Sequence, residues 1–220
     1  MKKYYHAYDE RYKTIHEKGY SWSSDKPTPK VLEVLEKYHI DNKSKILEIG
    51  CGEGRDSVVL LKEGYNLLAT DASKEAIQYC QNKCPKYKNS FQLLDCLNNN
   101  NEEKYDFIFA VAVLHMLVLD EDRNAFYQFI YSHLADKGIA LVFSMGNGEH
   151  EMMSDINEAF ELKERNHESG KIQVAATSCR MVSFKTFRKE IADCHLKILE
   201  DGITESFPDF DKLMFAVLKK

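Results

Sequence analysis

Three glycines stand at alternate positions in one short stretch of this chain, between an apolar run and a helix-like run. The stretch reads Glu48-Ile49-Gly50-Cys51-Gly52-Glu53-Gly54-Arg55. Glycine lets the backbone turn sharply and lets a ligand approach main-chain atoms, while the N–H groups at a helix start attract an anionic group. A dinucleotide loop would have its third glycine where Arg55 stands. Because Glu48 and Glu53 are acidic, the loop better suits a ligand that carries an ammonium as well as a carboxylate.

The elements that must position this loop alternate between strand-like and helix-like runs. Apolar runs predict strands at 45–49, 66–70, 91–94, 105–111 and 138–145, and helical spacing predicts helices at 55–63, 74–82 and 120–134. Strands separated by helices of this length form parallel βαβ units. The last third predicts a helix at 183–194 and strands at 195–200 and 213–218, whose short connection forces an antiparallel pair.

Two segments lie outside this alternation. Residues 1–40 predict a tyrosine-rich helical arm, which ends in a helix capped by Thr28 with Pro29 at its first position. Residues 146–172 form a polar insert with a helical middle near 155–165. We expect one domain over 1–220, with the arm and the insert as lids at the carboxyl ends of the strands, where open α/β sheets bind ligands.

Composition narrows the class of protein. The 220 residues carry a net charge of −5 with no basic stripe, which argues against a nucleic-acid partner. Six cysteines without a regular spacing indicate reduced thiols in the cytoplasm. The start lacks the apolar run of a signal peptide, and the longest apolar stretch, 107–119, is too short to span a membrane.

The run E-x-G-x-G-x-G after the first strand resembles the first motif of class I S-adenosylmethionine-dependent methyltransferases. Further landmarks follow in the family's order: Asp71 lies 21 residues after Gly50, Asp95 and Cys96 end the third strand, and 110–114 follow the fourth. The resemblance implies an α/β, Rossmann-like, seven-stranded sheet, mostly parallel with an antiparallel C-terminal strand pair, and helices on both faces. It implies S-adenosyl-L-methionine as the cofactor, held by Glu48, Gly50, Cys51, Gly52, Gly54, Arg55, Asp71, Ala72, Asp95, Cys96 and Val111.

The continuation Gly-Arg-Asp-Ser at 54–57 looks like the small-molecule branch that includes tellurite-resistance and thiopurine methyltransferases. The resemblance therefore implies methyl transfer to a small-molecule acceptor by in-line displacement. Three alternatives stay open: a protein that binds the cofactor without turnover, a protein methyltransferase, and a nicotinamide-dependent oxidoreductase. The Gly54-Arg55 pair and the antiparallel edge disfavour the last.

A few polar and aromatic residues are candidates for the chemistry itself. His115 follows the fourth strand and is the candidate general base, or else packs beside the cofactor. Trp22, the only tryptophan, either faces the sulfonium or anchors the arm. Arg180 needs an anionic partner, either on the substrate or in an internal salt bridge, and His150 is a second candidate for substrate contact. No metal site is expected, because Glu149-His150-Glu151 lacks further ligands at coordination spacing.

Overall fold

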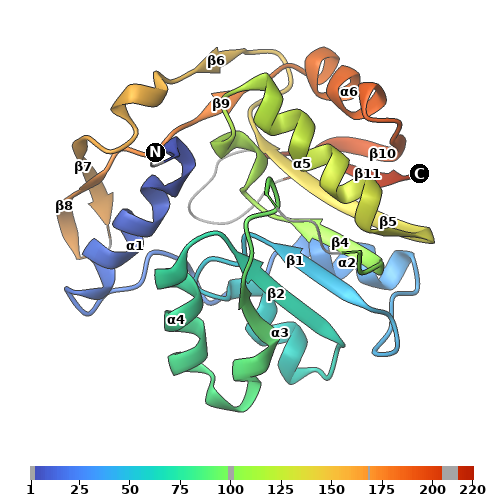
Figure 1. The fold of residues 1–220 in the computed structure, drawn as a ribbon, viewed down its shortest axis with the longest axis horizontal. Helices are drawn as coiled ribbons and strands as arrows, with labels where there is room; N and C mark the ends of the chain where they lie inside the picture. Colours follow the sequence, from blue (N-terminus) through green and yellow to red (C-terminus); the bar gives the residue numbers. More distant parts are fainter. Residues whose placement is uncertain (1–2, 99–101, 168, 205–212) are drawn as a thin grey trace.

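A seven-stranded sheet forms the middle of the protein (Figure 1), which is described here by a computed structural model over residues 3–98, 102–167, 169–204 and 213–220. Its strands are β1 (Ile46–Ile49), β2 (Leu67–Asp71), β3 (Phe91–Leu93), β4 (Tyr105–Ala110), β5 (Leu134–Met145), β10 (Lys197–Thr204) and β11 (Leu213–Lys219). The helices are α1 (Ala7–His16), α2 (Pro29–Lys37), α3 (Arg55–Lys62), α4 (Lys74–Lys83), α5 (Asp120–His133) and α6 (Phe184–Asp193), with short 3-10 helices η1 (Tyr4–His6), η2 (Pro85–Ser90), η3 (Leu114–Met116) and η4 (Ile156–Glu158).

The strand order is β10-β11-β5-β4-β1-β2-β3. The five strands from β3 to β5 are all parallel, as the βαβ spacing predicted. The C-terminal pair β10 and β11 is antiparallel, and β11 also runs antiparallel to β5. The predicted fold class is confirmed. The order reverses between β1 and β4, which places the carboxyl ends of these two strands at the point where open α/β sheets bind ligands.

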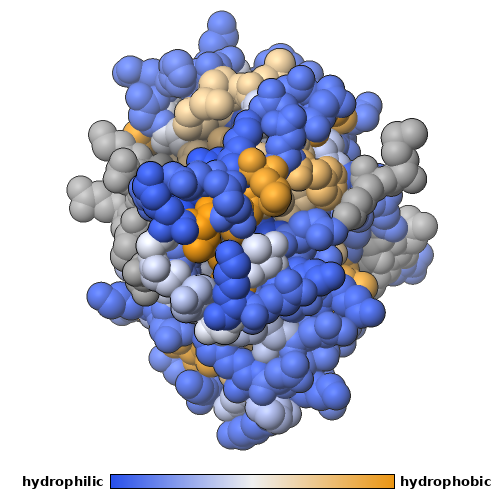
Figure 2. All heavy atoms as spheres, turned by 90° about the vertical axis from the view of Figure 1, so that its left-hand side faces the viewer, coloured by the Kyte–Doolittle hydropathy of each residue, from blue (hydrophilic) through white to orange (hydrophobic). Residues whose placement is uncertain are grey.

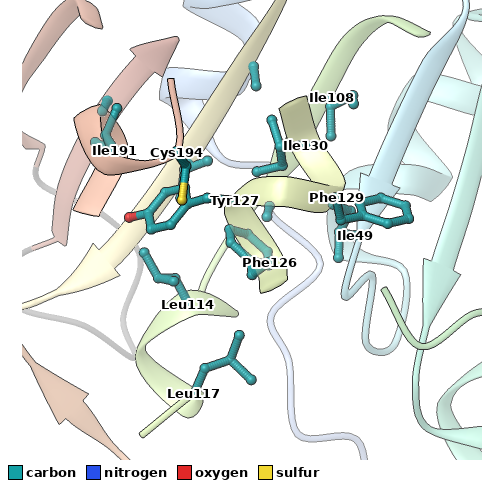
Figure 3. Packing of buried hydrophobic residues seen from close by; sticks show 14 of the residues in the cluster. Ile49, Ile108, Leu114, Leu117, Phe126, Tyr127, Phe129, Ile130, Ile191 and Cys194 are labelled. Carbon is teal, nitrogen blue, oxygen red and sulfur yellow. The ribbon is translucent and has the colours of Figure 1, made fainter. Parts of the chain in front are cut away.

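Helices cover both faces of the sheet. On one face α2, α3 and α4 pack against the alternate strand residues Phe107, Phe109 and Leu141. On the other, α5 and α6 pack against Ile108 and Ala140, and Figure 3 shows the aromatic and aliphatic side chains gathered around α5. Strands buried on both faces explain the nearly continuous apolar runs in the sequence. Together the two layers hold the strand ends, and the loops that leave them, in fixed positions.

Helix starts follow the local sequence at two places. The Ser73 side chain accepts a hydrogen bond from the N–H of Ala76 at the start of α4, and Ser183 does the same with Thr186 at α6. Such caps satisfy a backbone donor that the helix itself leaves unpaired. Thr28 precedes Pro29 as predicted, but its hydroxyl makes no cap and instead donates to Asp56. The arm is thereby attached to the helix that follows the glycine loop.

The insert differs from its prediction. Residues 155–165 were expected to be helical, whereas only η4 is, and β7 (Leu162–His167) pairs with β8 (Gly170–Ala175) as an antiparallel hairpin. Ile172 and Val174 face Ile15 of α1 and the Trp22 ring, so burial on alternate positions decides the structure over local helix propensity. Two short strands, β6 (Met152–Met153) and β9 (Arg180–Met181), also pair. In Figure 1 the hairpin and α1 lie side by side at one edge of the molecule.

Within the described ranges, no helix combines the length and the apolar character needed to cross a lipid bilayer.

Candidate functional site

The glycine loop (residues 48–55) turns as the sequence predicted, from β1 directly into α3. Gly50, Gly52 and Gly54 all have positive φ, at 74°, 53° and 82°. The N–H groups of Gly50 and Cys51 both donate to the carbonyl of Thr70, at 2.7 and 2.8 Å, which ties the loop to the end of β2. A side chain at Gly50 would meet Val113 Cγ2 at 2.3 Å. Glycine is thus required both for the backbone angle and for the close approach.

Asp71 is the last residue of β2 and lies next to the glycine loop. Its carboxylate accepts hydrogen bonds from the N–H of Gly52 and the N–H of Ser73, both at 2.8 Å. Burial raises the pKa of Asp71 to about 6, against which the backbone donors act. The group is therefore ionised at neutral pH and retains lone pairs for hydroxyl donors of a ligand.

An inner cavity lies between these strand ends and the arm. Its walls include Asp71, Ala72, Asp95, Cys96 and Val113 from the sheet side, and Tyr5, Tyr8 and Tyr12 from the arm. Asp95 accepts from the hydroxyl of Tyr5 and the N–H of Leu97, both at 3.0 Å. The two carboxylates predicted at the ends of β2 and β3 thus line one cavity, and the arm covers it.

An outer cleft adjoins this cavity, and both share Gly50, Tyr8, Tyr12 and Met116 as wall residues. It is the larger of the two, with about 1880 Å³ of empty space against about 690 Å³, open solvent included in both. Its other walls come from the glycine loop, the turn after β4, the hairpin and the stretch 176–179. Of the predicted residues, Glu48, Cys51, Gly52, Arg55, Val111, His115 and Trp22 all line it.

The two acidic residues of the glycine loop, Glu48 and Glu53, were expected to suit a ligand ammonium group, but in the structure both are bound by groups of the protein itself. Glu53 is buried and accepts from the N–H groups of Trp22 and Ser23 and the hydroxyl of Ser23, at 2.7–2.9 Å, with His16 Nε2 at 2.9 Å. Glu48 is also buried and is hydrogen-bonded to Ser57. Burial, with Asp56 nearby, raises the pKa of Glu48 to about 8. Neither acid therefore offers a free negative charge to an ammonium group at neutral pH.

Arg55 pairs with the buried Asp56, at 3.2 Å, and contacts the Thr28 hydroxyl at the same distance. The sequence left open a ligand carboxylate or a surface acid as its partner. The acid found is the adjacent residue, and it is buried rather than on the surface. Because Arg55 also lines the outer cleft, this pair places a guanidinium next to the glycine loop.

His115 lies in η3 at the wall of the outer cleft and is almost fully buried. Burial, together with the Arg123 charge, lowers its pKa to about 4. The imidazole is therefore neutral at physiological pH. A neutral ring is able to accept a proton, but so low a pKa makes it a weak base there.

Trp22 anchors the arm, and it also lines the cleft. Its backbone is bound by Glu53, and its ring packs against the hairpin beside His167, with ring centroids 6.0 Å apart.

Sequence reasoning missed Arg11, which lies in the same wall of the outer cleft. The available signal was the spacing of Tyr8 and Tyr12 on one helix, which marks the face that meets the core.

Arg180 and His150 lie outside both the inner cavity and the outer cleft. Arg180 donates to the Val118 carbonyl and the Asp120 carboxylate, at 2.7 and 2.6 Å, so its anionic partner is internal. His150 is exposed after β5, where its N–H donates to Asn147. The structure therefore does not bring these two residues together with the other predicted site residues. In the described part of the chain, no three His, Cys, Asp or Glu side chains are grouped so as to hold a metal ion.

Residues 47–140, from the glycine loop through β4 to β5, match a family model described as a methyltransferase domain. The chain is similar to a protein of Haemophilus influenzae described as a probable S-adenosyl-L-methionine-dependent methyltransferase TehB, with 32% identity over 88 residues. That match spans 39% of this chain and 30% of the relative, so it falls well short of the relative's full length.

Solved structures resemble the whole fold. The CcbJ methyltransferase of Streptomyces caelestis superimposes with a TM-score of 0.73 at 13% identity, over 99% of each chain. A 1,6-didemethyltoxoflavin-N1-methyltransferase of Burkholderia thailandensis, solved with its substrate and S-adenosylhomocysteine, gives 0.69 at 12% identity, over 94% of this chain and 84% of that one. At such identities the likeness is one of fold.

Proposed function

We propose that the chain is a class I S-adenosylmethionine-dependent methyltransferase, which transfers the cofactor's methyl group to a small-molecule acceptor. The observation that carries the proposal is the junction of two spaces at the glycine loop. The inner cavity ends in two carboxylates, and the outer cleft opens beside it across Gly50 and Met116. A cofactor that bridges them would present its methyl group to the cleft.

The residues around the inner cavity fit this cofactor. Gly50 and Gly52 line these spaces, and a side chain at either would meet a neighbour within 2.7 Å, so glycine keeps the loop backbone next to the space for a ligand. Gly54 lines neither space, and a side chain there would meet Cys80 and Val58 at 3.1 Å. Asp71 would bind the ribose hydroxyls, and Asp95 with Cys96 would contact the adenine ring, beside Ala72. Val111, Cys51, Glu48 and Arg55 would surround the methionine end. Bound there, S-adenosyl-L-methionine supplies an electrophilic methyl group on a sulfonium.

The protein's own part in the reaction is alignment and exclusion of water. An in-line displacement with a good leaving group needs the nucleophile held in line with the methyl group. The arm and the hairpin, as lids, would close the cleft on the side away from the sheet. His115 is neutral, so it would accept a hydrogen bond or a proton from an acceptor that arrives protonated.

A small acceptor fits this enclosed cleft better than a protein or nucleic-acid segment. The cleft is walled on several sides by the arm, the hairpin and the 176–179 stretch. The net charge of −5 disfavours a nucleic-acid partner. The Burkholderia thailandensis neighbour was solved with a small molecule, 1,6-didemethyltoxoflavin, bound to it. We place the enzyme in the cytoplasm, since its six cysteines are all free thiols.

Isothermal titration tests the cofactor directly, with S-adenosylmethionine, S-adenosylhomocysteine and NAD as ligands. We expect both sulfur nucleosides to bind and NAD not to bind. Asp71→Ala should weaken them by roughly tenfold or more, because a charged hydrogen-bond acceptor is lost. Asp106→Ala is the matched control: this carboxylate also accepts a backbone N–H, from Lys45 at 2.8 Å, but at the opposite end of the sheet.

Binding of NAD alone, or of none of the three, would refute the proposal. Binding of both sulfur nucleosides without methyl transfer to any of a broad panel of acceptors would favour a binding protein without turnover. Transfer to basic proteins but not to small molecules would move the substrate class to the protein methyltransferases.

A further inference from the structure

Arg11 is a buried cation in the wall of the outer cleft. It donates from Nε and Nη2 to the carbonyl of Ala175, at 3.1 and 2.7 Å, and from Nη2 to that of Ala176, at 2.7 Å. Its Cζ lies 5.0 Å from the Tyr8 ring centroid and 4.9 Å from that of Trp22. Carbonyls and ring faces fix the guanidinium in place, but they carry no full negative charge to balance it.

Arg165 brings a second cation to the same place from the hairpin. Its Nη2 lies 3.5 Å from the Ala176 carbonyl oxygen, the same atom that Arg11 contacts. Burial first, and the Arg165 charge in addition, lower the pKa of Arg11. Within the described residues, neither guanidinium has a carboxylate at ion-pair distance. Two like charges so arranged repel each other until an anion joins them.

The acids in the same wall are engaged elsewhere. Glu53 is surrounded by its four donors from the arm, and Asp56 binds Thr28 and Arg55. Glu48 keeps its proton at neutral pH. The cleft therefore has an excess of positive charge at the Arg11–Arg165 pair, although the whole chain is acidic.

We propose that Arg11 and Arg165 together bind an anionic group, a carboxylate or a phosphate, on the methyl acceptor. Guanidinium groups suit such oxyanions because they donate several hydrogen bonds in one plane. The Tyr8 and Trp22 rings and Met116 and Met152 line the same cleft and would contact the apolar body of the molecule. This inference rests on the proposed function and adds the substrate class to it.

The cofactor's own carboxylate is the competing occupant of such a site. Arg55, next to the glycine loop, is the cation closest in sequence to the expected methionine end, whereas Arg165 lies on the hairpin. The test must therefore separate the two carboxylates. Comparing S-adenosylhomocysteine with 5′-methylthioadenosine does so, because the second lacks the amino acid carboxylate.

Trp22, the only tryptophan, gives a direct readout because it stacks on Arg11. Protein saturated with S-adenosylhomocysteine is titrated with benzoate, with its neutral analogue benzamide, and with inorganic phosphate, while tryptophan fluorescence is recorded. We expect benzoate to bind at least about tenfold more tightly than benzamide, the discrimination typical of a charged hydrogen bond. Arg165→Gln should remove that preference.

Lys171→Gln is the matched control, because it removes one positive charge from the same hairpin, where Lys171 pairs with Glu164 away from the cleft. It should leave benzoate binding unchanged. Equal binding of benzoate and benzamide, no binding of benzoate and phosphate, or an unchanged preference in Arg165→Gln would each overturn the proposal. So would a loss of S-adenosylhomocysteine binding in Arg165→Gln with 5′-methylthioadenosine unaffected, since the cofactor would then be the occupant.

The two proposals fail separately. Anion binding without any binding of S-adenosylhomocysteine would keep the anion site and refute the methyltransferase function. Binding of S-adenosylhomocysteine without anion binding would do the reverse.

Discussion

The glycine loop and the wall opposite it are built in different ways. The loop is one contiguous stretch, residues 48–55, fixed by its own backbone angles and by hydrogen bonds to Thr70. The arm–hairpin wall, made of α1, the 17–28 turn, β7 and β8, joins parts far apart in sequence, with Arg11 bonded to Ala175 across 164 positions. Figure 2 shows the side of the molecule on which α1 and the hairpin lie in Figure 1, with a few hydrophobic residues exposed among hydrophilic ones. The glycine loop of the proposed cofactor site is thus encoded locally, whereas the proposed acceptor site forms only in the folded chain.

The largest expected effect on the glycine loop comes from adding a single methyl group at Gly50. Gly50→Ala should lower the free energy of unfolding by about 2–4 kcal/mol, because a positive φ costs an alanine about 1–2 kcal/mol and the clash with Val113 adds to it. Urea denaturation measures this, and titration should show S-adenosylhomocysteine binding lost. Gly64→Ala is the control, since its φ is 87° but a side chain there would touch nothing within 4 Å. Equal losses in both variants would mean that the contact with Val113 is unimportant.

The link between the two regions is Glu53, which belongs to the loop but binds the arm. Glu53→Gln would place an amide NH₂ against backbone donors, so we expect a loss of about 1–3 kcal/mol in the free energy of unfolding. Hydrogen exchange should rise in residues 17–28 more than in the loop. Glu75→Gln is the milder control, because Glu75 is partly exposed and contacts His16. Faster hydrogen exchange throughout the protein, with no preference for the arm, would contradict the inference that Glu53 holds the arm against the glycine loop.

A smaller expected effect is a pH dependence of the free energy of unfolding that comes from Glu48 in the glycine loop and not from the arm–hairpin wall. The Glu48 carboxyl keeps its proton up to about pH 8 when folded and releases it near 4.5 when unfolded. The native state binds more protons in that window, so the free energy of unfolding falls as pH rises, by at most about 1.4 kcal/mol per pH unit. Glu48→Gln should remove this part of the slope, and the exposed Glu36→Gln should not. Chemical denaturation at pH 5, 6, 7 and 8 compares them, and parallel slopes in all three proteins would rule out a protonated Glu48.

Sequence patterns predicted those parts of the structure that depend on residues close together in the chain. The strands of the sheet and the position of Asp71 at the end of β2 follow from short-range patterns, and the structure has them. The prediction was wrong where contacts with residues far away in the chain determine the structure. The charged run at 155–165 has helix propensity, yet part of it becomes β7 because β8 pairs with it and α1 covers the hairpin.

The same limit explains the site residues. Arg180 was expected to need an anion, and it has one in Asp120, but which anion depended on the packing of two distant segments. Arg11 carried no signal of its own, since its partners are carbonyls of residues 175 and 176. The spacing of Tyr8 and Tyr12 marks the face of α1 that meets the core, but no local pattern identifies these carbonyls as the partners of Arg11.

Three methionines, Met116, Met145 and Met152, stand in the wall of the outer cleft. A thioether chain is unbranched and turns about three bonds, so it fills a space of irregular outline without a fixed shape of its own. Such a wall sets weak demands on the skeleton of a molecule, whereas the two guanidinium groups proposed to bind the acceptor would set a strong demand on its charge. The enzyme would therefore tolerate a family of acceptors with different ring systems, sorted by a common anionic group rather than by outline.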